Sequence, residues 1–77
     1  MQASIFKGKE VLLGDVSVSV VEEASLSTWV GFVYLPPGGE LAEGEYELSL
    51  EDGRSGTVLV VSVKDGIARF RGLGPLA

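Results

Sequence analysis

Hydrophobic and polar residues alternate along much of the chain, in short runs that glycine-containing turns separate. Eleven glycines punctuate these runs, and alternation with period two between turns is typical of β-strands. No segment has useful helical periodicity. The best helical candidate, residues 22–26, amounts to one turn at most. The pattern therefore predicts an all-β fold.

The C-terminal half has the clearest pattern. Residues 45–51 alternate without a fault, and Asp52-Gly53 follows as a dipeptide that suits a two-residue type I′ turn. Residues 54–64 then form a second run, Asp65-Gly66 repeats the turn signal, and residues 67–71 return as a third run. We predict a three-stranded antiparallel meander here.

The two predicted turns also define a register. A two-residue loop at Asp52-Gly53 pairs Leu48 with Thr57, and one at Asp65-Gly66 pairs Val61 with Phe70. Cross-strand partners share a face of the sheet. The register therefore places one apolar set on a single face: Tyr46, Leu48, Leu50, Leu59, Val61, Val63, Ala68 and Phe70. On the reverse face we expect Ser62 opposite Arg69, and a Glu51–Arg54 pair closing the first turn.

The N-terminal half is less regular. Residues 3–6 and 10–13 flank Lys7-Gly8-Lys9 and suit a hairpin, and Gly14-Asp15 then leads into a strand at 16–21. Residues 28–35 are apolar on both parities, that is, at both the odd and the even positions of the strand. Residues 35–44, which contain two prolines, form a loop.

The N-terminal strands are the only material that can cover the meander. We predict one domain, residues 1–77, folded as a small antiparallel barrel or roll of about five to seven short strands. An SH3-like barrel, an OB-like barrel and a small sandwich all fit this pattern.

Composition narrows the chemistry. The chain has no histidine and no cysteine, which excludes Ser-His-Asp and Cys-His catalysis and the usual zinc ligands. The polar start does not resemble a signal peptide, and no apolar run approaches membrane length, so we expect a cytoplasmic protein. The net charge of −5 argues against non-specific binding to nucleic acid or to an anionic membrane.

Three aromatic residues are the first candidate site. Trp29, Phe32 and Tyr34 lie in the run that is apolar on both parities. They are either core residues of a doubly covered strand or part of a surface that meets a partner, where Tyr and Trp are enriched. Because so short a chain can cover few strands twice, we expect one parity, Trp29 with Val33 or Phe32 with Tyr34, to stay accessible.

A basic group, Lys64, Arg69 and Arg71, is a second candidate, for an anion or nucleic acid. Edge-strand charges that resist aggregation explain this group better in an acidic chain. The glutamates at 40, 43, 45 and 47 suit a solvated face better than a metal site. We therefore predict no cofactor and no enzymatic activity. We predict a binding module for a protein partner or for homo-oligomeric assembly, with a ligand- or nucleic-acid-binding barrel as the alternative.

Overall fold

The computed structural model describes residues 1–23 and 28–77. Every regular element in these ranges is a β-strand, as the sequence pattern predicts. The strands are β1 (Gln2–Lys7), β2 (Glu10–Glu23), β3 (Thr28–Tyr34), β4 (Gly44–Leu50), β5 (Ser55–Lys64) and β6 (Ile67–Leu73). Most of the helical candidate at 22–26 lies outside the described residues.

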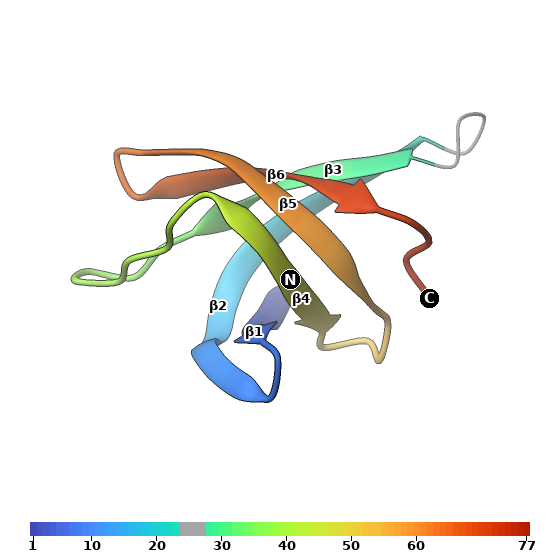
Figure 1. Ribbon diagram of the computed structural model, residues 1–77, viewed down its shortest axis with the longest axis horizontal. Coiled ribbons are helices and arrows are strands. Elements are labelled where there is room, and N and C mark those ends of the chain that lie inside the picture. The colour runs from blue at the N-terminus through green and yellow to red at the C-terminus, as the bar shows by residue number, and fades with distance from the viewer. Residues whose placement is uncertain (24–27) are drawn as a thin grey trace.

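The six strands form one closed antiparallel barrel. Their order around the barrel is β1-β2-β3-β6-β5-β4, and β4 pairs back onto β1. The predicted small barrel and its C-terminal meander of β4, β5 and β6 are thus confirmed. Figure 1 shows β3 and β6 side by side in the upper part of the molecule, with β1 and β4 in the lower part. Closure leaves no free edge among the described strands, because each pairs with two neighbours.

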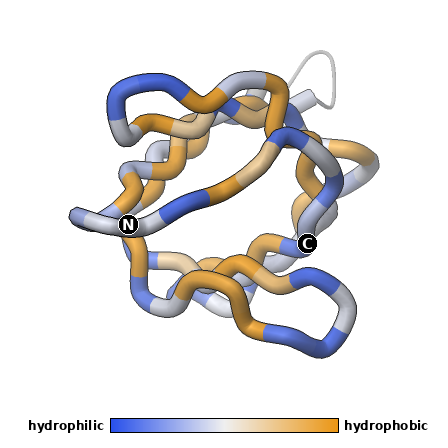
Figure 2. The backbone as a smooth tube through the Cα atoms, turned by 60° about the vertical axis from the view of Figure 1, so that its left-hand side comes forward, coloured by the Kyte–Doolittle hydropathy of each residue, from blue (hydrophilic) through white to orange (hydrophobic). Residues whose placement is uncertain are grey.

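Alternation along the strands builds the core. Along each strand, alternate side chains point into the barrel and the others point outward. Hydrophilic segments gather in the connections between strands (Figure 2). The buried set draws on all six strands and on the segment between β3 and β4: Ala3, Ile5, Val16, Val18, Trp29, Val33, Leu41, Tyr46, Leu48, Leu50, Val58, Val60, Ala68 and Phe70.

The first turn of the meander differs from the prediction. The chain reverses over three residues, 51–53, and Gly53 has a φ of 94°. The N–H of Gly53 donates to the carbonyl of Leu50, the pattern of a type I turn followed by a left-handed glycine. The Asp52 carboxylate stabilises this turn by accepting the N–H of Arg54 at 3.0 Å. Leu48 therefore pairs with Gly56 and not with Thr57, so the predicted register was wrong by one residue.

The second turn agrees with the prediction. Asp65 and Gly66 both have positive φ, 53° and 76°, as a type I′ turn requires. Ser62 pairs with Arg69, as predicted, but Phe70 pairs with Val60 because Val61 is an extra residue in β5. This β-bulge shifts the register back by one.

The two register errors therefore affect β5 from Ser55 to Val61 and cancel beyond the bulge. Leu59 and Val61 do not join the core, and Val58 and Val60 take their places. Tyr46, Leu48, Leu50, Ala68 and Phe70 are buried as predicted, whereas Val63 is 37% exposed and lies outside the core.

The predicted hairpin at the N-terminus is present, with β1 and β2 on either side of Gly8-Lys9. Gly14-Asp15, expected to precede a separate strand, instead lies inside the long strand β2. The register with β1 shifts there, and Asp15 has a φ of 50°. Bulges of this kind bend and coil a strand, which lets one strand follow the barrel wall.

The barrel has two different ends. The loop end carries the turns at 8–9 and 65–66 and the segment 35–43. The tail end carries the N-terminus, the turn at 51–53 and the last residues of the chain. At the tail end Ala77 and Ser55 exchange two backbone hydrogen bonds, and Leu76 packs against the core.

Candidate functional site

Strand β3 has one buried and one exposed parity. Trp29 and Val33 lie in the core, at 3% and 1% exposed. Val30, Phe32 and Tyr34 point outward and are 45%, 38% and 42% exposed. The expected accessibility of one parity is therefore observed, on the side of Phe32 and Tyr34.

Trp29, one of the three aromatic candidates, is a core residue. Its indole ring packs edge-on against Phe70, with ring centroids 5.9 Å apart, and Nε1 donates a hydrogen bond to the carbonyl of Gly74 at 2.9 Å. A residue placed in this way contributes to stability and leaves Phe32 and Tyr34 as the aromatic candidates for a partner surface.

Pairing between β3 and β6 joins the two candidate groups that the sequence kept apart. Val30 lies opposite Arg71, Phe32 opposite Arg69, and Tyr34 opposite Ile67. All six side chains point outward, and the bulged Val61 of β5 is exposed beside them. We call this surface the β3–β6 face: Val30, Phe32, Tyr34, Val61, Ile67, Arg69 and Arg71. Lys64 lies at its margin, opposite Ile67.

Local contacts hold the aromatic side chains of this face in place. The hydroxyl groups of Tyr34 and Ser19 are 3.1 Å apart and share a hydrogen bond. The guanidinium carbon of Arg69 lies 6.0 Å from the ring centroid of Phe32, within the range of a cation–π contact. The face is therefore partly organised before any partner binds, which lowers the entropy cost of binding.

A hollow lies in the middle of the β3–β6 face. Its volume is about 370 Å³, and the paired residues Gly31 and Phe70 line it together with Val30, Phe32 and Val61. Gly31 cannot carry a side chain here, because a Cβ would overlap the Ser19 carbonyl oxygen and the Phe70 ring. The two arginines complete the lining. The hollow is open and mainly apolar, with cationic groups at its rim.

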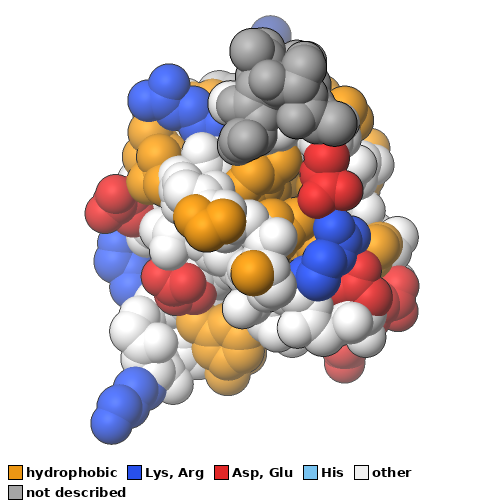
Figure 3. Space-filling view, turned by 90° about the vertical axis from the view of Figure 1, so that its right-hand side faces the viewer, with side chains coloured by type: hydrophobic (Ala, Val, Ile, Leu, Met, Phe, Trp, Pro, Cys, Tyr) orange, Lys and Arg blue, Asp and Glu red, His pale blue; other side chains and the backbone are white. Residues whose placement is uncertain are grey.

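Arg54, the arginine at the tail end, is paired with acidic side chains. Arg54 forms ion pairs with Glu22 and Asp52, both at 2.9 Å. These contacts raise the pKa of Arg54, and the largest cause is the hydrogen bond that its side chain donates to the Asp52 carboxylate. The pKa of Asp52 is lowered, chiefly because the N–H of Arg54 donates to its carboxylate. Figure 3 views this end, where acidic and basic side chains lie next to each other. This cluster is a structural tie between β2 and the turn at 51–53.

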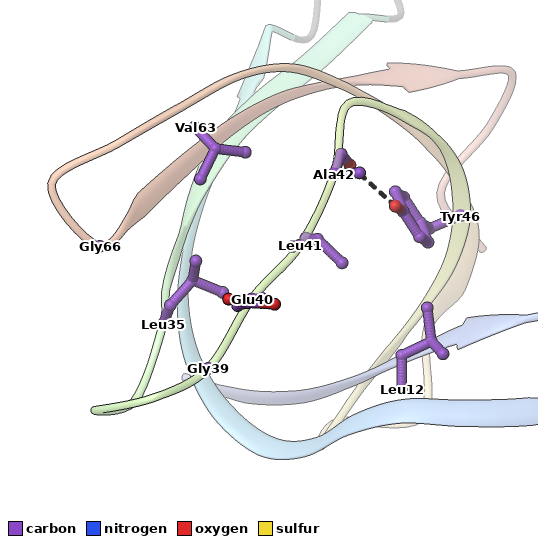
Figure 4. Close-up of a pocket in the computed structure, with 9 residues that line it drawn as sticks. All are labelled: Leu12, Leu35, Gly39, Glu40, Leu41, Ala42, Tyr46, Val63 and Gly66. Carbon is purple, nitrogen blue, oxygen red and sulfur yellow. Dashed lines mark hydrogen bonds between the residues drawn. The ribbon is translucent and has the colours of Figure 1, made fainter.

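Another hollow lies at the loop end. Leu12, Leu35, Leu41 and Val63 line it together with Tyr46, and its volume is about 590 Å³ (Figure 4). Leu41 closes the barrel from this side, and the hydroxyl of Tyr46 donates to the carbonyl of Ala42 at 2.8 Å. Glu40 is the one ionisable side chain among the lining residues besides Tyr46. Such a wide apolar depression without convergent polar groups lacks the features that orient a small ligand.

The acidic residues do not converge. Glu45 and Glu47 point outward from β4, on the opposite side of the barrel from β3, and Glu47 accepts a hydrogen bond from Thr57 at 2.9 Å. Within residues 1–23 and 28–77, no group of three or more acidic side chains is arranged to hold a metal ion. The same residues contain no helix that could cross a bilayer.

Comparisons with the models of known protein families, with curated proteins and with solved structures found no match for this chain.

Proposed function

We propose that this protein is a non-enzymatic binding module that recognises another protein through its β3–β6 face. The observation that carries the proposal is the exposure of Val30, Phe32 and Tyr34 in one row beside Arg69 and Arg71. Aromatic residues and arginine are the residue types enriched in protein interfaces, and a few such side chains supply most of the binding energy.

The surroundings of this row support the same interpretation. Val61 and Ile67 extend the apolar surface across β5 and β6, so the exposed apolar side chains are contiguous and not scattered. Contiguous apolar patches on a small domain mark interaction sites. The hollow, at about 370 Å³, has room for one large side chain of a partner.

A nucleic-acid-binding barrel is the second candidate. It is favoured by one observation, that Phe32 and Tyr34 share a face with Arg69, since single-stranded binding combines stacking aromatics with cations. The net charge of −5 counts against it. Titration with single-stranded oligonucleotides at several salt concentrations separates the two: steep salt-dependent binding favours nucleic acid, and its absence favours protein.

The test of a protein partner uses matched substitutions on β3. Phe32→Ser and Tyr34→Ser change the exposed parity and should leave the fold intact, whereas Val33→Ser changes the buried parity and should unfold the domain. We expect the first two variants to lose binding to a protein partner that the unchanged protein retains. Lys9→Glu, in the β1–β2 turn, is the control. Equal binding by Phe32→Ser, Tyr34→Ser and Lys9→Glu would contradict the proposal.

A further inference from the structure

The β3–β6 face differs in charge from the rest of the molecule. The chain has eleven acidic and six basic residues, yet Arg69 and Arg71 lie on this face and Lys64 at its margin. Both ion pairs found among the described side chains involve Arg54 at the tail end. Arg69 and Arg71 are therefore not neutralised by any described carboxylate.

From this arrangement we infer that the partner is a protein segment in which acidic residues flank an aromatic or aliphatic side chain. The inference rests on the proposed function of the face. The apolar side chain would occupy the hollow over Gly31 and Phe70, and the carboxylates would pair with Arg69 and Arg71 at its rim. Arginine favours such pairs because its planar guanidinium binds a carboxylate through two parallel hydrogen bonds.

The contact between Arg69 and Phe32 agrees with this use. The guanidinium carbon lies 6.0 Å from the Phe32 ring centroid, and a contact with a ring face uses none of the N–H groups of the arginine, so these can still donate to a carboxylate. The nearby ring also limits the space open to Arg69, so less side-chain entropy is lost when an anion binds.

Two other modes of binding are disfavoured by the fold. A partner cannot add a strand to the sheet, because the closed barrel leaves no free edge among the described strands. A second copy docking through the same face would bring Arg69 and Arg71 close to their own counterparts, and like charges placed together oppose association. An acidic partner removes this repulsion.

Selection from a display library of random short peptides tests the inference. The wild-type protein should enrich peptides in which Asp or Glu flanks an aromatic or aliphatic residue. Affinity for these peptides, measured by fluorescence anisotropy, should fall about tenfold or more in Arg71→Glu, and also in Phe32→Ser. It should stay unchanged in Lys9→Glu, which alters net charge by the same amount as Arg71→Glu. Circular dichroism confirms that each variant is folded.

The possible failures are distinguishable. If the selected peptides lack acidic residues but bind the Phe32→Ser variant more weakly than the wild type, the inference of an acidic partner is wrong and the proposed function still stands. Acidic peptides that bind Arg71→Glu as well as wild type would also overturn it. Binding of a short oligothymidylate that Arg71→Glu abolishes, without any enriched peptide, would overturn both proposals in favour of nucleic acid. If the peptides bind all variants equally, the binding site lies elsewhere on the molecule.

Discussion

At the scale of single residues, Trp29 shows how closely the tail end of the barrel is packed. Its ring occupies the space that a Cβ would need at Gly72 and at Gly56, and its hydrogen bond to Gly74 prevents it from moving aside. Gly72→Ala should therefore destabilise the domain by about 1–3 kcal/mol. Gly14→Ala, where a Cβ meets open space, is the control. Urea unfolding measures both, and similar midpoints would mean that the ring can shift.

The hydrogen bonds of Asp52 predict that the stability of the folded domain depends on pH. The pKa of Asp52 is lowered in the folded state, chiefly because the N–H of Arg54 donates a hydrogen bond to its carboxylate. Desolvation acts in the opposite direction and has the smaller effect. The ionised carboxylate therefore favours the folded state above the unfolded pKa, and this contribution is lost as the pH falls through the folded pKa. Asp52→Asn should lower the melting temperature near neutral pH and have less effect once the pH falls below the folded-state pKa of Asp52. The effect is small because the group is exposed, and a constant difference at every pH would contradict this origin.

At the scale of elements, local turn chemistry was predictable only in part. Asp65-Gly66 behaves as its sequence predicts, but the same dipeptide at Asp52-Gly53 forms a longer loop, because Asp52 bonds to the N–H and side chain of Arg54. The bulge at Val61 has no sequence signal, since valine suits either face of a strand. Barrel curvature requires a bulge somewhere, and only the closed structure shows where.

The face assignment in β5 can be tested directly. Val58 is buried, whereas Val61 is exposed on the bulge, which reverses the assignment that two simple turns would produce. Val58→Thr should cost about 1–3 kcal/mol, because it buries a hydroxyl group among apolar side chains. Val61→Thr should change stability by about 0.5 kcal/mol or less. Chemical denaturation compares the two variants, and a larger loss for Val61→Thr would restore the original register.

At the scale of the whole molecule, the candidate site depends on a pairing that no local pattern reveals. The aromatic row and the basic pair were both recognisable in the sequence, but as separate groups with separate explanations. They share a face only because β3 pairs with β6, so that Phe32 lies opposite Arg69. Which strands become neighbours follows from barrel closure and not from the alternation within either strand. The fold class was therefore predictable, and the composition of the site was not.

The stability of the whole barrel depends on a thin core. A chain of this length hides a modest fraction of its surface, and domains in general are stable by only about 5–15 kcal/mol. Phe70 is 2% exposed, contacts Trp29 and lines the hollow of the β3–β6 face. Phe70→Ala should cost about 3–5 kcal/mol, enough to unfold a large share of the molecules. Phe32→Ala removes the same ring from the outer surface and should leave the melting temperature nearly unchanged. Thermal unfolding of both variants compares a ring on the inner face of the barrel sheet with a ring on its outer face. A mild effect of Phe70→Ala would mean that the core tolerates a cavity beneath the binding surface, whereas a strong effect of Phe32→Ala would mean that the exposed aromatic row serves stability and not recognition.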